Sequence, residues 1–170
     1  VRTHEFAFVS LRQVGAFRSW AERGHGPAPG EGAAFLVLED ERQALARGAR
    51  IHARIAEHAL ATAHRSRPLA ATFSDLIARM RPRDVSAIVA AGDGDRAISE
   101  AESEALDRSA PRSAVRRHPK QFMGNLYAAA AAVQVALAAE VARRSGRGAS
   151  VLANCFGHGS QHGSLLLEGA

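Results

Sequence analysis

The chain has 170 residues, of which 46% are hydrophobic and 23% are charged, and its formal net charge is +5. This is the composition of one globular domain, and it argues against a disordered or collagen-like chain. The single cysteine, Cys155, excludes an internal disulfide and favours a reducing, cytoplasmic setting. The arginines are scattered and do not alternate with aromatic residues, so nucleic acid is not the expected partner.

The sequence predicts neither a targeting peptide nor a membrane span. Residues 1–15 lack the charged region and the unbroken apolar run of a signal peptide. The longest apolar stretch, 126–139, is mostly alanine and contains Gln134, so it is too short and too weakly apolar to cross a bilayer. Because the first residue is valine, the chain is expected to begin inside a longer protein.

In the first half of the chain, short periodic segments alternate with glycine- and proline-rich loops. The segment 51–62 is ambiguous, but apolar residues alternate with longer polar ones at its start, which favours a strand. The predicted elements are a helix or two at 6–20, a loop at 21–32, a buried strand at 33–40, a short helix ending near Gly48, a strand at 51–62 and a helix at 71–80.

The second half continues the alternation and ends in two strands. Strands that alternate with helices are typical of an α/β layered fold, here with a largely parallel sheet and an antiparallel finish. The predicted elements are a strand at 85–92, a turn and helix at 93–108, a short strand at 113–119, a long helix at 123–144, and strands at 149–157 and 160–169.

Four motifs occur in order: PGEGAAFLVLED at 29–40, VAAGDGDRAISEAESEAL at 89–106, HPKQFMGNLYAAAAAV at 118–133 and NCFGHGSQHGSLLLE at 154–168. They resemble, in the same order, four landmarks of the β-ketoacyl synthase family. The resemblance covers nearly the whole chain. It implies that residues 1–170 are the C-terminal half of a ketosynthase-like domain with a thiolase-like layered fold, a mixed sheet with covering helices. The N-terminal half, which carries the family's nucleophilic cysteine, is absent.

The resemblance also assigns the positions of the family's catalytic residues. The two histidines that polarise the malonyl carbonyl fall on Ala91 and Asn125, and the lysine that orients one of them falls on Lys120. Glu102 resembles the glutamate near that lysine, which implies a retained buried ion pair between Glu102 and Lys120. The family's substrate gate and oxyanion loop corresponds to Phe156, Gly157, His158 and Gly159.

Each assignment has a simpler structural alternative. Lys120 is the only lysine in a chain with 21 arginines. One interpretation is that a compact ammonium fits a crowded site that a guanidinium does not. The alternative is that Lys120 is an ordinary exposed residue. Asn125 either opens the following helix as a capping residue or donates a hydrogen bond to a carbonyl without titrating. Ala91 does neither, so these positions offer no general acid or base. His158 replaces the gating phenylalanine, and Pro27 replaces an aromatic residue of the family.

Other patterns are interpreted as structural, and no metal or cofactor is expected. Cys155 falls where the family has a serine on its last strand, so it is expected to be a small buried residue. His118, His158 and His162 do not spell out a tetrahedral ligand set. The GDGD sequence at 92–95 lacks the remaining ligands of a calcium loop and is expected to be a turn.

By resemblance, the chain is expected to be a non-catalytic chain-length factor of type II, aryl-polyene-like polyketide or fatty acid biosynthesis. It would pair with an active ketosynthase, or with itself, and would meet an acidic acyl carrier protein through arginines. One alternative is a divergent active 3-oxoacyl-[acyl-carrier-protein] synthase whose nucleophilic cysteine lies upstream, and another is a fragment without function. The candidate carrier-binding arginines are Arg116, Arg117, Arg143, Arg144 and Arg147.

Overall fold

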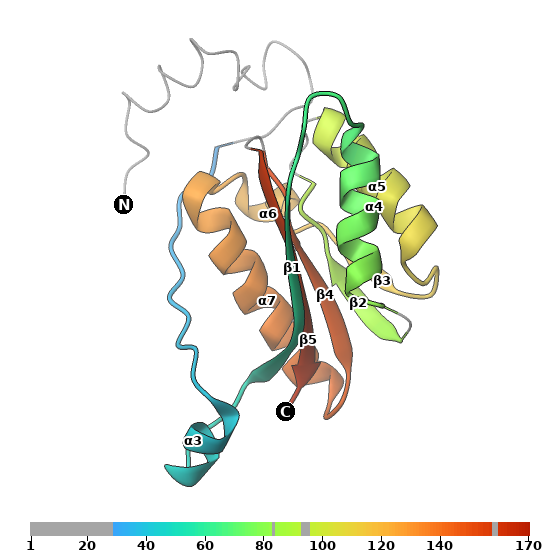
Figure 1. The fold of residues 1–170 in the computed structure, drawn as a ribbon. Helices are drawn as coiled ribbons and strands as arrows, with labels where there is room; N and C mark the ends of the chain where they lie inside the picture. The colour runs from blue at the N-terminus through green and yellow to red at the C-terminus, as the bar shows by residue number, and fades with distance from the viewer. Residues whose placement is uncertain (1–28, 83, 93–95, 158–159) are drawn as a thin grey trace.

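The computed structural model describes residues 29–82, 84–92, 96–157 and 160–170. The expected helix at 6–20 and most of the loop at 21–32 lie outside these residues. So do Pro27, His158 and Gly159. The described residues form a five-stranded mixed sheet with helices on both faces (Figure 1). This arrangement confirms the α/β layered fold expected from the alternating elements.

The strands of the sheet lie in the order β1-β5-β4-β2-β3. Strand β2 pairs in parallel with β3 and β4, whereas β5 pairs antiparallel with both β4 and β1. The antiparallel finish was predicted, and β1 resolves the ambiguous segment 51–62 as an edge strand. The strand bounds are β1 Ala53–Thr62, β2 Val85–Val89, β3 Val115–Arg117, β4 Ser150–Cys155 and β5 Gln161–Gly169.

Helices α4 (Leu69–Arg79) and α5 (Arg96–Ser109) cover one face of the sheet, and α7 (Ala130–Ser145) covers the other (Figure 1). Neighbouring strand residues point to opposite faces, so the central strands β2 and β4 each contribute to two cores. On β2, Ile88 joins the core under α4 and α5, whereas Val89 joins the core under α7. The two buried faces explain why the central strands are almost continuously apolar.

Helix α7 packs closely on the sheet because its buried face is made of small side chains. Ala138 and Ala142 are completely buried there. A Cβ atom at Gly169 of β5 would lie 2.7 Å from the carbonyl oxygen of Ala142, closer than real Cβ contacts allow. The alanine-rich sequence therefore brings the helix and strand backbones together, as its composition indicates.

The long helix predicted for 123–144 begins later, at Ala130. It is preceded by a helical turn, α6 (Lys120–Met123), and by a 3₁₀ turn, η1 (Tyr127–Ala129). Gly124 (φ 73°) and Tyr127 (φ 51°) adopt left-handed backbone conformations, which end one turn and reorient the next. Apolar periodicity alone does not reveal this interruption, and the interruption sets the shape of the site described below.

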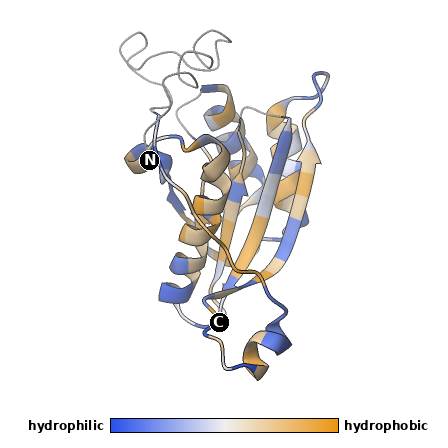
Figure 2. Ribbon diagram, turned by 90° about the vertical axis from the view of Figure 1, so that its left-hand side faces the viewer, coloured by the Kyte–Doolittle hydropathy of each residue, from blue (hydrophilic) through white to orange (hydrophobic). Residues whose placement is uncertain are grey.

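The buried strand predicted for 33–40 is wrong for the described residues. We call residues 29–40 the arm; it is an extended segment that runs beside α7 and is not part of the sheet (Figures 1 and 2). The side chains of Phe35 and Val37 are 95% and 87% exposed. A continuous apolar run is typical of a strand that is buried on both faces. The described strands form one sheet, and the arm is not paired with any of them.

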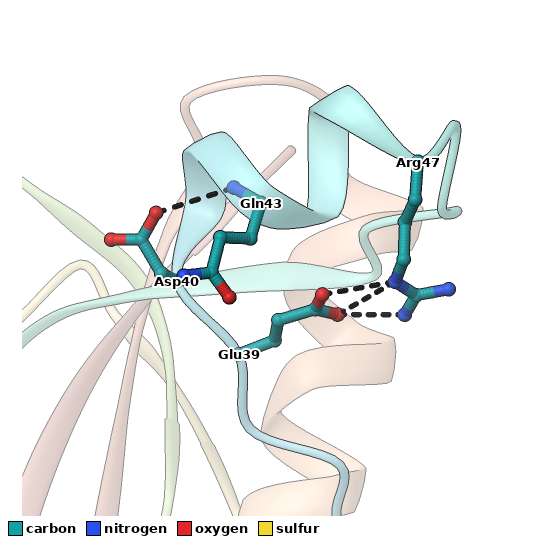
Figure 3. Close-up of polar contacts among 4 residues, drawn as sticks. All are labelled: Glu39, Asp40, Gln43 and Arg47. Carbon is teal, nitrogen blue, oxygen red and sulfur yellow. Dashed lines mark hydrogen bonds and ion pairs between the residues drawn. The ribbon is translucent and has the colours of Figure 1, made fainter.

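The arm ends in a short helix, α3 (Glu41–Ala46), that fixes its direction. Asp40 caps the helix through Oδ1, which accepts hydrogen bonds from the amides of Arg42 and Gln43 at 3.0 and 3.2 Å. Glu39 forms a two-pronged ion pair with Arg47, with a shortest distance of 2.6 Å (Figure 3). Local sequence therefore holds the C-terminal end of the arm.

Candidate functional site

A pocket of about 280 Å³ lies where β4 ends and α6 and α7 begin. It brings together four of the residues that the sequence resemblance assigned to a site: Lys120, Asn125, Phe156 and Gly157. His158 and Gly159 lie outside the described residues. A larger and more open groove of about 420 Å³ lies between the C-terminal ends of α4 and α5, but it contains none of the assigned residues. The smaller pocket is therefore the candidate site.

Glu102 of α5 is buried beside this pocket and is held by three hydrogen bonds. Its Oε1 accepts from the amide of Ala91 and from Asn154 Nδ2, both at 2.8 Å, and its Oε2 accepts from the amide of Gly92 at 2.6 Å. Asn154 in turn accepts a hydrogen bond from Ser164 Oγ at 2.9 Å. One carboxylate thus joins α5, β4, β5 and the residues that follow β2.

Burial raises the pKa of Glu102, while the hydrogen bonds from Ala91, Asn154 and Gly92 and the nearby His118 oppose that change. Gly92 gives the carboxylate its room, because a Cβ atom there would lie 3.3 Å from Oε2. The amides of Ala91 and Gly92 are both engaged by Glu102. The sequence did not reveal Asn154 or Ser164, although polar residues inside an apolar strand pair were the available signal.

The predicted ion pair between Glu102 and Lys120 is not formed. Both side chains are buried, yet no ion pair joins them, and the carboxylate oxygens bond to other groups. Lys120 instead lines the pocket near Cys155. The prediction that Lys120 is buried is confirmed, whereas the partner assigned from the resemblance is wrong, because the backbone after β2 supplies donors that sequence motifs do not display.

Cys155 lines the same pocket, but its thiol is protonated near neutral pH. Burial raises its pKa to about 11; the charge of Lys120 lowers this value and that of Glu102 raises it. Since the thiolate is the nucleophile, this cysteine is a poor one. Its Sγ lies 3.9 Å from the carbonyl oxygen of Ala131, a weak contact. Cys155 is half-buried rather than fully buried as expected, because it lines the pocket.

Asn125 fills a structural role in the turn before α7. Its Oδ1 accepts a hydrogen bond from the amide of Tyr127 at 2.9 Å, and its backbone oxygen accepts one from the amide of Gly30 at 3.0 Å. The first contact is the local side-chain to backbone bond expected of an asparagine that opens a helical turn. Asparagine remains neutral at any physiological pH, so this position supplies no proton transfer.

Two buried polar residues near the site were missed by the motif reading. Gln134 of α7 lines the pocket and donates from Nε2 to the carbonyl oxygen of Ala90 at 3.0 Å. His162 of β5 is 2% exposed, and neither of its ring nitrogens has a hydrogen-bond partner among the described residues. It packs edge-on against Phe73 and Phe156, whose rings stack 3.9 Å apart. Burial lowers the pKa of His162.

Within the described ranges, no three histidine, cysteine, aspartate or glutamate side chains are grouped as a metal site requires. The ring of His162 packs edge-on against the rings of Phe73 and Phe156. No helix in the described part of the chain is long and apolar enough to cross a membrane.

Comparison with known sequences gives one consistent group of relatives. No family model matches the chain. The tetracenomycin polyketide synthase ketoacyl synthase beta subunit of Streptomyces glaucescens is 36% identical over 132 residues, which are 72% of this chain. The match covers 32% of that relative, so the chain spans about a third of the length of the curated relatives it matches.

Solved structures show the same fold over a larger share of the chain. The ishigamide ketosynthase/chain length factor superposes with a TM-score of 0.78 and 23% identity, covering 100% of this chain and 52% of that one. A type II polyketide ketosynthase in complex with its acyl-carrier protein superposes with a TM-score of 0.70 and 19% identity, covering 85% of this chain and 42% of that one.

Proposed function

Because this chain belongs to the ketosynthase-like proteins of thiolase-like fold, we propose that it is part of a chain-length factor. Such a subunit carries out no condensation itself. It pairs with an active ketosynthase in a type II, aryl-polyene-like polyketide or fatty acid system and limits the length of the acyl chain. Among its relatives, the Streptomyces glaucescens protein carries the name of a ketosynthase beta subunit, and one solved neighbour carries the name of a ketosynthase/chain length factor.

The observation that carries this proposal is that neither Ala91 nor Asn125, at the two histidine positions of the family, has a side chain that can carry a proton. By resemblance, an active ketosynthase places histidines where this chain has Ala91 and Asn125. The Asn125 amide is fixed in a turn, and the Cys155 thiol has a pKa of about 11. General acid or base catalysis requires a group that titrates near the working pH. The pocket therefore favours a supporting role over a condensing one.

We further propose that residues 1–170 form the C-terminal half of a longer subunit. The chain covers about half of a solved neighbour and about a third of the curated relatives. The exposed apolar side chains of the arm, including Phe35, Val37 and Leu38, are also expected to be covered by further polypeptide. An extended segment that is apolar on both faces gains stability when further polypeptide covers those faces.

Co-expression of the complete protein with its candidate ketosynthase tests the proposal. We expect the two to purify together, and we expect the protein alone to release no carbon dioxide from a malonyl-carrier thioester. Decarboxylation by the protein alone would contradict the proposal and favour a divergent active synthase. Failure to bind a ketosynthase, together with no effect on product length, would contradict it in favour of a fragment without function.

The five arginines proposed to meet an acyl carrier protein lie toward two opposite ends of strand β2. Arg116 and Arg117 pair with Ile88 and Val89 at the end of β2. Arg143, Arg144 and Arg147 precede Ser150, which lies opposite Val85 at the start of β2. Four strand residues separate these ends by roughly 13 Å. Because Lys120 of the pocket follows β3 directly, we propose that Arg116 and Arg117 face the carrier protein.

Two matched charge reversals test this assignment. Arg116 is ion-paired with Asp107, so the exposed Arg117 is the cleaner position, and the exposed Arg147 is the control at the far end. We expect Arg117→Glu to weaken carrier affinity by about three- to tenfold, because an attraction becomes a repulsion, while Arg147→Glu changes it less than twofold. Calorimetry on the complete subunit measures both, and equal effects would mean that only net charge matters.

A further inference from the structure

The start of the arm lies against the turn that forms one wall of the pocket. Pro29 and Asn125 form an isolated parallel bridge, and the amide of Gly30 donates to the backbone oxygen of Asn125 at 3.0 Å. These contacts join two segments that are far apart in the sequence. They are the contacts through which the arm meets the pocket wall in the described part of the chain.

Gly30 sits where no side chain fits. A Cβ atom there would overlap the carbonyl oxygen of Met123 and would lie 2.9 Å from Leu126 Cδ2. The backbone of the arm is therefore pressed directly onto the backbone of the turn. At Gly32 the nearest atom is Leu126 Cδ1 at 3.2 Å, the end of a flexible side chain, so a methyl group there is accommodated by a small shift. The two glycines differ in what they meet.

The turn needs to be held from outside because its own backbone is unfavourable. Tyr127 adopts a φ of 51°, a conformation that is uncommon for a residue with a bulky side chain. Such conformations persist only where the surrounding contacts over-determine them. Two hydrogen bonds to Asn125 are among the contacts that hold the turn: one from the amide of Tyr127 to Oδ1 and one from the amide of Gly30 to the backbone oxygen.

The turn faces the lysine and the cysteine across the pocket. Asn125 and Tyr127 lie on the same lining as Lys120 and Cys155. Burial is the main cause of the raised pKa of this thiol, so a change in the pocket wall that admits more water would lower that pKa. The state of the turn can therefore be followed at Cys155, the single cysteine of the chain.

We propose that Gly30 is a positioning residue for the pocket: it clamps the turn at Asn125 and thereby holds in place the pocket wall that the turn shares with Cys155. The clamp also links the exposed arm to the pocket, so a partner that moves the arm would move the pocket wall. This inference does not depend on the proposed function, because neither its geometry nor its test uses an activity.

Alkylation of Cys155 by iodoacetamide in the complete folded protein, followed at that residue by peptide mass spectrometry, tests the clamp. We expect Gly30→Ala to raise the alkylation rate at mildly alkaline pH by about tenfold or more, since each unit of lowered thiol pKa gives about ten times more thiolate. The pH at which the rate is half-maximal should fall from about 11. Gly32→Ala is the matched control, with an expected change of less than about threefold because it meets only a side-chain end.

A merely structural glycine would give a different pattern. Gly30→Ala would then lower the midpoint of denaturant unfolding but leave the alkylation rate of the folded protein at the Gly32→Ala value. A folded Gly30→Ala variant with unchanged alkylation rate and pH profile would overturn the proposal. Equal acceleration in both variants would overturn it as well, because the effect would then belong to the whole arm.

If Gly30→Ala does not fold, hydrogen exchange in the unsubstituted protein tests whether Gly30 holds the turn. The amides of Gly30 and Tyr127 both donate to Asn125, so a clamp predicts that one opening event exposes both. Their opening equilibria should agree within about twofold. If the opening equilibrium constant of the Gly30 amide exceeds that of the Tyr127 amide by more than about tenfold, the arm detaches while the turn keeps its structure. That result would contradict the proposal.

Discussion

Glu102→Ala should cost roughly 3 to 5 kcal/mol of unfolding free energy, because it strands three buried hydrogen-bond donors. The donors are the amides of Ala91 and Gly92 and the side-chain amide of Asn154, and each loses its partner. A domain of this size has a total stability of about 5 to 15 kcal/mol. The variant should therefore be close to unfolding at ambient temperature, as denaturant titration would measure.

Two companion variants test whether the effect comes from the negative charge of Glu102, from the volume of its side chain or from any carboxylate on α5. Glu102→Gln keeps the volume but points an amide donor at one of the existing donors, so we expect a smaller loss of about 1 to 2 kcal/mol. Glu104→Ala removes an exposed carboxylate of the same helix, which is ion-paired with Arg108. Its cost should stay within about 1 kcal/mol. A loss below about 1 kcal/mol for Glu102→Ala would show that the three hydrogen bonds accepted by Glu102 contribute little to stability.

The sign of the Glu102 pH effect follows from its raised pKa. The folded state then binds more protons than the unfolded state between the ordinary value of 4.5 and the higher folded value. Stability contributed by this group is therefore greatest in acid and decreases as the pH rises through that window. The Glu102→Gln variant should lack this slope, and a difference titration against the unsubstituted chain measures it.

Acid should destabilise the protein through His162, and this is the second large effect that we expect. Burial lowers the pKa of this imidazole, so the unfolded state binds more protons than the folded state below the ordinary value of 6.5. Stability falls as the pH decreases from 6.5 toward the folded value, by at most about 1.4 kcal/mol per pH unit. Below the folded value both states are protonated, and the slope from this group ends.

His162→Phe should remove this acid-dependent loss. A phenyl ring fits the contacts with Phe73 and Phe156 and cannot take up a proton. We expect the stability near neutral pH to change by less than about 1.5 kcal/mol, because the swap nearly conserves volume and leaves no ring nitrogen unpaired. The exposed His52 provides the control, His52→Phe. Retention of the acid-dependent loss in His162→Phe would show that another group causes it.

The arm is the clearest case in which local pattern and tertiary structure disagree. Its apolar run carries the pattern of a strand buried on both faces, and its backbone is indeed extended. Whether such a run is buried depends on neighbours that are remote in sequence, and the described residues provide none. The same limit applies to the late start of α7, where a left-handed Gly124 and Tyr127 interrupt a periodicity that reads as continuous.

The candidate site shows the same division. Sequence motifs placed Lys120, Asn125, Phe156 and Gly157 in one site, and the pocket lining brings them together. They did not identify Asn154, Ser164, Gln134 or His162, because these residues act through contacts between different elements. The supposed ion pair of Glu102 failed for a related reason. Its actual partners include backbone amides, whose positions no side-chain pattern records.

The sequence by itself determined the alternation of strands and helices, the small-residue packing of α7 and the loss of titratable groups at positions 91 and 125. Those properties are local, because periodicity, side-chain size and the ability to ionise belong to single residues and their near neighbours. Only the tertiary structure decided which donors hold Glu102, toward which end of β2 each arginine lies and where the arm meets the turn at Asn125. Each of these depends on distances between segments remote in the chain, which the burial of apolar surface fixes when the layers pack together.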